Sequence, residues 1–266
     1  MSGARSGPRP LSVGSLFSGI GGLDLGFERA GFDLAWMCES SPYCRRVLAR
    51  HWPRVPLYDD VCTLGTPDGP TPAPVDVLVG GFPCQDISWA GKGAGIDGAR
   101  SGLWGEYLRL VRALRPGFVL VENVPALLAR GLDRVLGDLA ACGYDAEWEV
   151  LGADALGATQ HRERVWILAY PDDAGLQGTI WAGQPVTAWE AGEAAHSEPL
   201  RSDCGLWPPG PGAVLHVPRM ADGPAHRMDR LHALGNAVVP QVAEHIARAL
   251  RAYAEARGLW PAGVPT

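Results

Sequence analysis

The sequence predicts an α/β protein with one doubly wound, mostly parallel sheet and a small irregular region late in the chain. Three observations lead to this prediction. Short apolar runs alternate with amphipathic helical segments over roughly the first 170 residues, the pattern of a parallel sheet with helices on both faces. Turn residues follow the apolar runs, at the carboxyl ends of the expected strands, and sheets of this kind bind ligands at those ends. The chain has 266 residues, 47% of them apolar, and can bury one large core.

The expected strands end at polar or glycine-rich turns. Residues 11–17 are apolar enough for a buried parallel strand, whereas 144–151 alternates between polar and apolar side chains, as a half-exposed strand does. The full set of expected strands is 11–17, 34–38, 55–61, 75–81, 118–124, 144–151 and 164–170.

Helices are expected between the strands and at the end of the chain, at 22–30, 42–52, 103–114, 126–141 and 240–256. Ser41 is placed as the N-cap of the second helix, with Pro42 at its first position. Gly31 and Gly143 follow two helix ends, as glycine often does. An apolar stripe at helical spacing supports the helix before Pro116 and consists of Leu103, Tyr107, Leu110, Val111 and Leu114.

Residues 171–218 differ from the alternating part of the chain. They are rich in glycine and proline, contain three tryptophans and have no sustained periodicity, so this segment is either functional or disordered. Six acidic residues stand there against the single Arg201. The sequence therefore divides into a disordered leader at 1–10, a main domain at 11–170, this insert, and a C-terminal segment at 219–266 that returns to the main domain.

Bulk properties exclude some classes of protein. No run approaches the ~20 apolar residues of a membrane helix, and no hydrophobic segment follows the arginines of residues 1–10, so a cytoplasmic protein without a signal peptide is expected. The six cysteines have neither CxxC nor zinc spacing, which favours free thiols and no metal site. The net charge of −6 gives no support to DNA binding, which depends on cation–phosphate contacts.

The glycine-rich turn after the first strand, within residues 16–31, is a candidate cofactor loop. Its glycines leave backbone amides and a helix N-terminus open to a ligand, although the turn is one glycine short of GxGxxG and also suits close packing. Glu39 follows the second strand, where an acid can accept from ribose hydroxyls, and Asp60 follows the third, where it can accept from an exocyclic amine. Both acids could instead be solvated turn residues.

Cys84 lies in a Phe-Pro-Cys-Gln turn directly after the strand at 75–81. An activated thiolate needs an exposed, polar setting of this kind, whereas a structural cysteine is more often found inside a strand. Glu122 ends the next strand and should face the same cleft. Arg162 and Arg164 precede another strand, and their i, i+2 spacing directs both side chains to one side.

Five motifs in this order resemble the DNA (cytosine-5)-methyltransferase family: FxGxGG, DVLVGGFPCQxxS, ENV, QxRxR and GNAVVP at 235–240. The resemblance covers roughly residues 11–170 and 219–250. It implies the fold of S-adenosylmethionine-dependent methyltransferases, S-adenosylmethionine as the cofactor and double-stranded DNA as the substrate. We also expect a monomeric enzyme without a metal. The main domain would then be catalytic and cofactor-binding, and the insert would recognise the target.

The resemblance also implies a role for each catalytic residue. The Cys84 thiolate adds to cytosine C6, Glu122 hydrogen-bonds N3 and the 4-amino group, and Arg164, with Arg162 near the thiolate, binds the C2 carbonyl. These groups act where charge develops, and the cytosine must leave the duplex to reach them. The residues implied for S-adenosylmethionine are Phe17, Ser18, Gly19, Gly21, Gly22, Glu39, Asp60, Val61, Asn236 and Ala237.

The sequence gives less information about the contacts with DNA than about the catalytic and cofactor residues. Lys92, the only lysine, lies in a glycine-rich loop at 91–102 that should close over DNA; it could meet a phosphate or remain solvated. The acidic insert cannot supply most of the phosphate affinity, which should come from Lys92 and the arginines 100, 219, 227 and 230. The insert would then read base edges through Gln177, Gln184 and Arg201. Alternatively, it is a solvated loop and residues 219–234 read the target.

Other functions remain as alternatives. RNA methylation by the same chemistry is the nearest, but the related tRNA methyltransferases carry a Cys-Phe-Thr tripeptide that is absent here. Amino-methyltransferases carry a Pro-Pro-Tyr/Phe turn, and the only Pro-Pro here, at 208–209, is followed by glycine. A nicotinamide-dependent oxidoreductase would leave the Phe-Pro-Cys-Gln and QxRxR motifs unexplained. A non-catalytic DNA-binding relative would have little need for Cys84, Glu122 and Arg164 together.

Overall fold

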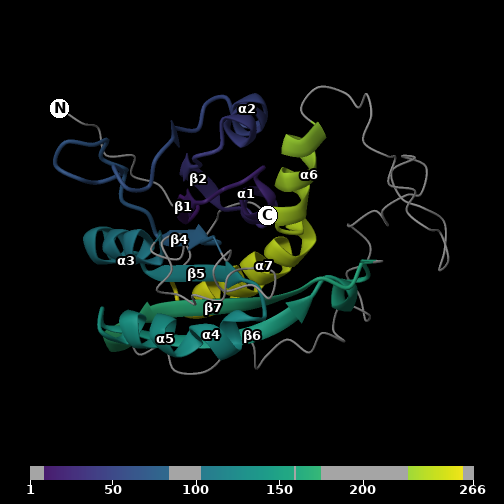
Figure 1. Cartoon of the computed structure of the whole chain (residues 1–266). Coiled ribbons are helices and arrows are strands. Elements are labelled where there is room, and N and C mark those ends of the chain that lie inside the picture. Colours follow the sequence, from purple (N-terminus) through teal and green to yellow (C-terminus); the bar gives the residue numbers. More distant parts are fainter. Residues whose placement is uncertain (1–8, 84–102, 159, 175–226, 260–266) are drawn as a thin grey trace.

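The computed structural model describes residues 9–83, 103–158, 160–174 and 227–259. Seven strands form one sheet in the order β3-β2-β1-β4-β5-β7-β6 (Figure 1). The first five in this order are parallel, and β7 runs antiparallel to both β5 and β6. The predicted α/β fold with a mostly parallel sheet is confirmed. The strands are β1 Ser12–Leu16, β2 Asp33–Cys38, β3 Leu57–Tyr58, β4 Val77–Gly80, β5 Phe118–Asn123, β6 Tyr144–Gly152 and β7 Glu163–Pro171.

The helices agree with the sequence pattern at most positions. They are α1 Gly22–Arg29, α2 Pro42–His51, α3 Leu103–Leu114, α4 Leu127–Arg130, α5 Leu132–Ala140, α6 Arg227–Asn236 and α7 Pro240–Ala256. Two short 3₁₀ turns occupy Asp154–Leu156 and Asp172–Ala174. The N-cap of α2 is confirmed, because the Ser41 hydroxyl accepts from the backbone N–H of Cys44 at 3.4 Å.

Two helical predictions need correction. The single helix expected at 126–141 is divided into α4 and α5 at Gly131, whose backbone leaves the helical region at φ 160° and ψ 6°. Glycine favours the helical conformation less than any residue except proline, so it is the natural point for this break. Helix α6 was not predicted from the sequence; on it Ala233 is buried, whereas Leu234 is 64% exposed.

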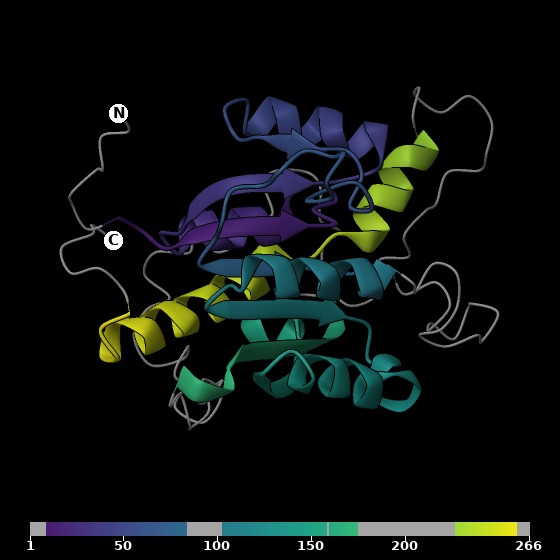
Figure 2. The ribbon, with the colours of Figure 1, turned by 90° about the vertical axis from the view of Figure 1, so that its left-hand side faces the viewer.

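Helices cover both faces of the sheet. Residues of α1, α2 and α7 pack with one set of alternating strand residues, and residues of α3, α4 and α5 pack with the other set. Figure 2 shows α3 and α7 on opposite sides of the sheet. Glycine permits a close contact between two helices: a Cβ on Gly26 of α1 would lie 2.5 Å from the Cβ of Ala243 in α7. Both faces are therefore closed, and ligand access is expected at the sheet edges.

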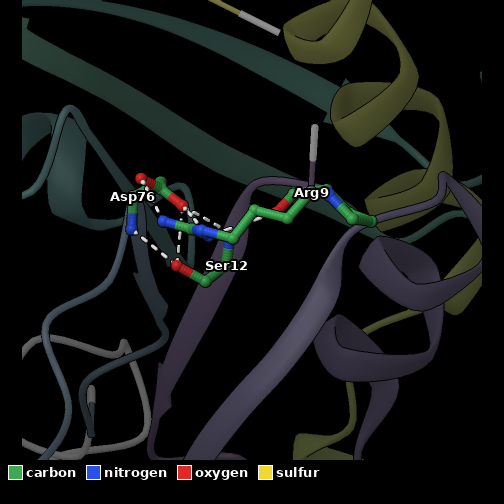
Figure 3. Close-up of polar contacts among 4 residues, drawn as sticks. Arg9, Ser12 and Asp76 are labelled. Carbon is green, nitrogen blue, oxygen red and sulfur yellow. Dashed lines mark hydrogen bonds and ion pairs between the residues drawn. The ribbon is translucent and has the colours of Figure 1, made fainter. Parts of the chain in front are cut away.

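A polar cluster joins the beginnings of β1 and β4 (Figure 3). Asp76 Oδ2 accepts from the Ser12 N–H at 2.7 Å, from the Ser12 hydroxyl at 2.7 Å and from Arg9 Nη1 at 2.9 Å. Burial alone would raise the pKa of Asp76, but these hydrogen bonds outweigh it and lower the pKa. The cluster fixes the two central strands at the end away from their carboxyl termini.

Within the described ranges, the helices are too short or too polar for any of them to cross a membrane. The cysteines at 38, 44, 62 and 142 are free thiols, as the sequence predicts for them. Cys62 is exposed and the other three are buried. Cys84 and Cys204 lie outside the described residues.

Candidate active site

One edge of the sheet collects the predicted site residues. The carboxyl ends of the parallel strands β3, β2, β1, β4 and β5 lie along it, and the antiparallel strand β7 begins there (Figure 1). Because Asn123 at the end of β5 pairs with Val165, Arg164 reaches the same edge as Glu122. The order of connection reverses between β1 and β4, the position at which open α/β sheets bind ligands.

The loop after β1 has a backbone suited to close ligand approach. Phe17, Gly19 and Gly21 have positive φ angles of 54°, 58° and 88°, and Gly21 is the N-cap of α1. Glu39 holds this loop: its Oε2 accepts from the Gly19 N–H at 2.8 Å and its Oε1 from the Ser41 N–H at 2.7 Å. A carboxylate oxygen has more than one lone pair, so Glu39 can also accept from a ribose hydroxyl.

Asp60 and Val61 follow β3 and extend this row of residues. Asp60 is exposed and its Oδ1 accepts from the Cys62 N–H at 2.8 Å, while Val61 is buried. A ligand with ribose hydroxyls and an adenine amine presents hydrogen-bond donors, and Glu39 and Asp60 present acceptors at the ends of neighbouring strands. These acceptors fit the cofactor that the sequence implies.

Asp24, a buried acid, lies in the first turn of α1, directly after the same loop, and was not among the predicted site residues. It is fully buried, and neither carboxyl oxygen has a hydrogen-bond partner among the described residues. Burial raises its pKa to about 7; the nearby Ser15 hydroxyl opposes this rise without forming a hydrogen bond of normal geometry, and Glu28 and Glu39 add to it. The signal in the sequence is an acid between Leu23 and Phe27, both on the buried face of α1.

Glu122 and Arg164 form a shielded ion pair at the end of β5. Arg164 Nε lies 2.9 Å from Glu122 Oε1, and the two side chains are 19% and 11% exposed. A Cβ on Gly81 would lie 2.5 Å from Glu122 Oε2, so glycine after β4 leaves room for the carboxyl group. Burial raises the pKa of Glu122, although Arg164 and Arg162 oppose the rise.

Asn123 lies beside the candidate site residue Glu122, and single-residue reasoning did not select it. Its Nδ2 donates to the Phe82 carbonyl at 3.1 Å, and its Oδ1 accepts from the Val124 N–H at 2.9 Å. The side chain is buried and links the chain after β4 to the end of β5. Position 123 within the ENV motif was the available signal.

Arg162 contacts the returning C-terminal segment. Its Nη2 donates to the Gly235 carbonyl at 3.0 Å and to the Ala237 carbonyl at 2.8 Å, on either side of Asn236. A small cavity lies beside this contact and is lined by Leu151, Arg162, Arg164, Trp166, Val238, Val239 and Val242. Burial and the adjacent Arg164 lower the pKa of Arg162, and Glu122 opposes this effect.

Several predicted residues lie outside the described part of the chain. They are Cys84, Lys92, Arg100, Gln177, Gln184, Arg201 and Arg219, together with the rest of the loop and nearly all of the insert. Arg227 begins α6 and Arg230 is exposed on it. The position of Arg162 beside the Cys84 thiolate therefore stays a prediction, as do the DNA contacts.

Comparisons with known proteins agree with this arrangement. The family model described as C-5 cytosine-specific DNA methylase matches residues 11–199. The type II methyltransferase M.NgoFVII of Neisseria gonorrhoeae is 36% identical over 166 residues, covering 61% of this chain and 44% of the relative. The type II methyltransferase M2.BsuMI of Bacillus subtilis is 36% identical over 167 residues, covering 60% and 42%. The chain thus matches less than half the length of these two relatives.

Solved structures share the fold. A crystal structure described as a DNA modification methyltransferase encoded within a prophage of E. coli has 29% identity and a TM-score of 0.54, covering 66% of this chain and 51% of that one. A DNMT2 mutant of Spodoptera frugiperda has 18% identity and a TM-score of 0.51, covering 64% and 52%, and supports the fold alone. Because the family model matches well over half of its residues, this chain belongs to the C-5 cytosine-specific DNA methylase family.

Proposed function

We propose that this protein transfers a methyl group from S-adenosylmethionine to C5 of a flipped-out cytosine in a short double-stranded DNA sequence. The observation that carries the proposal is the Glu122–Arg164 ion pair at the same sheet edge as the Glu39-anchored glycine loop. A shielded carboxyl and guanidinium are the groups that a pyrimidine ring needs when it gains electron density. The loop provides the neighbouring cofactor site.

Glu122 and Arg164 are proposed to hold the ring. Neutral cytosine has an acceptor at N3 and a donor at the 4-amino group, so a carboxyl that carries a proton can bind both. The raised pKa of Glu122 favours the protonated form that this contact requires. Arg164 is then available to bind the carbonyl oxygen at C2, where negative charge develops.

Cys84 is proposed as the nucleophile. Its thiolate donates an electron pair to C6, and the electrons of the C5–C6 double bond make C5 nucleophilic. S-adenosylmethionine supplies the electrophilic methyl group when it is bound. Loss of the C5 proton and expulsion of the Cys84 thiolate restore the aromatic ring. Asn123 supports this arrangement by fixing Phe82, two residues before Cys84, to the end of β5.

The cofactor is proposed to lie between the glycine loop and the carboxylates that follow β2 and β3. The residues proposed for it are Phe17, Ser18, Gly19, Gly21, Gly22, Glu39, Asp60, Val61, Asn236 and Ala237. Residues 11–170 would form the catalytic and cofactor-binding domain, 171–218 the target-recognition insert, and 219–266 the returning segment. We further propose a monomeric cytoplasmic enzyme that needs no metal.

A trapped intermediate tests this proposal. DNA with 5-fluorocytosine at the target position has no C5 proton to lose, so the enzyme should remain attached in a denaturation-resistant adduct. The adduct should require S-adenosylmethionine and vanish in Cys84→Ser, whereas Cys62→Ser, which removes an exposed thiol, should retain it. An adduct that persists in Cys84→Ser would reassign the nucleophile. An adduct formed with fluorinated RNA but not DNA would replace the proposed substrate.

A further inference from the structure

The two arginines of the QxRxR motif make different contacts. Arg164 pairs with the Glu122 carboxylate, whereas Arg162 donates from one nitrogen to the carbonyls of Gly235 and Ala237. Gly235 and Ala237 lie 73 and 75 positions after Arg162 in the chain. Arg162 thus fastens the start of β7 to the junction between α6 and α7.

The junction needs a cation from elsewhere in the fold. A helix C-terminus exposes carbonyls that have no partner within the helix and carries a partial negative charge. The last turn of α6 has no basic residue of its own. Arg162 satisfies the Gly235 carbonyl in that last turn and the Ala237 carbonyl just beyond it, and so caps α6 from the sheet.

The capped junction also touches the cofactor loop. A Cβ on Gly22, at the beginning of α1, would lie 2.3 Å from the Val238 carbonyl oxygen, so the backbones of the two segments are in close contact. Val238 directly follows Ala237, the residue whose carbonyl Arg162 holds. One continuous path therefore runs from Arg162 through residues 235–238 to the N-terminus of α1.

We propose that Arg162 is a positioning residue of the S-adenosylmethionine site, which holds Asn236 and Ala237 against the glycine loop, and that Arg164 alone of the pair serves the cytosine. This inference rests on the proposed function, because it takes residues 236–237 as part of the cofactor pocket. It divides the QxRxR motif into a cofactor-side arginine and a base-side arginine. Because Arg162 lies two residues from Arg164 in the chain, it also connects the proposed cofactor side of the site to the proposed base side.

The division is tested by calorimetric titration of S-adenosylmethionine into the full-length protein without DNA. Arg162→Met should raise the Kd about tenfold or more, since the junction loses a charged donor shared by two carbonyls. Arg162→Lys keeps the charge but not the reach of the guanidinium, and should restore part of the affinity. Arg164→Met should bind S-adenosylmethionine within about threefold of wild type. Arg248→Met, on the exposed side of α7, controls for loss of an arginine and should match wild type.

A second readout separates the two arginines further. In the 5-fluorocytosine assay at saturating S-adenosylmethionine, Arg162→Met should still form the adduct, whereas Arg164→Met should not. Wild-type cofactor affinity in folded Arg162→Met, or in Arg162→Lys if the methionine variant does not fold, would overturn the inference. Equal loss of affinity in Arg164→Met would overturn it too. Failure of the wild-type protein itself to bind S-adenosylmethionine would instead contradict the proposed function.

Discussion

Asp24→Asn should make the protein more stable at neutral pH, by an amount that grows as the pH rises from about 4 to 8 and then stays constant. Asp24 is fully buried in the first turn of α1 without a well-formed hydrogen bond among the described residues, and its pKa rises from 3.8 to about 7. Between these values, the unfolded chain has released the proton while the folded protein retains it. The stability that protonated Asp24 contributes is therefore fully present below pH 3.8 and is lost as the pH rises from there through 7.

The magnitude follows from the size of the shift. About three pKa units, at ~1.4 kcal/mol each, correspond to about 4 kcal/mol of stability lost once Asp24 is ionised in both states. About 2.5 kcal/mol of this loss falls between pH 5 and pH 8. Asparagine has nearly the same shape as aspartic acid and does not ionise. The stability of the Asp24→Asn variant relative to wild type should therefore rise by about 2.5 kcal/mol between pH 5 and pH 8.

Urea unfolding of both proteins at pH 5, 6, 7 and 8 measures the difference, and other ionisable groups largely cancel in it. Asp68→Asn removes an exposed acid and serves as the control, with no comparable trend expected. A difference between wild type and Asp24→Asn that stays flat from pH 5 to pH 8 would refute the reasoning. It would mean that Asp24 ionises in the folded protein as readily as in the unfolded chain.

Three further predictions concern the cofactor site, the β1–β4 cluster and target recognition. Asp60→Ala should weaken S-adenosylmethionine binding by about 1–3 kcal/mol, and unchanged calorimetric affinity in the folded variant would remove Asp60 from the site. Asp76→Asn should lower stability by about 1 kcal/mol at pH 7. Because the folded-state pKa of Asp76 is lowered, this loss should shrink in urea unfolding as the pH falls below about 4, and a constant loss would contradict the assignment. Arg230→Ala should weaken binding to all DNA sequences alike and reduce the salt dependence by about one phosphate contact, whereas Arg201→Ala should change the ratio between target and near-target sites. Replacing 171–218 by a neutral linker without altering methylation specificity would end the proposal that the insert recognises DNA.

Local sequence signals predicted the main elements well. Helix α3 ends at the predicted residue because its apolar stripe is regular and Pro116 follows it, and α7 begins at Pro240 as predicted. The alternating order of apolar runs and helical segments was sufficient for the class of sheet. The prediction that Glu39 and Glu122 lie at the ends of strands also holds, because it depends only on where the strands end.

Features that depend on contacts between distant parts of the chain could not be predicted from the local sequence. The break at Gly131 and the helix α6 lack a clear periodic signal. The burial of Asp24 depends on packing around the loop rather than on its own segment. The contact of Arg162 with Gly235 joins residues 73 positions apart, and spacing within the QxRxR motif does not reveal it. In each case, tertiary packing decided the outcome.

Bisulfite sequencing of DNA from cells that express the protein tests the central claim most directly, because it reads modified cytosine and sequence context together. The wild-type protein should protect cytosines in one short sequence, and cells expressing Cys84→Ser or Glu122→Ala should show conversion at those positions. Arg248→Met, remote from the site, should leave the pattern as in wild type. Complete conversion with folded wild-type protein that binds S-adenosylmethionine, or protection that persists in Cys84→Ser, would contradict cytosine-5 methylation through Cys84.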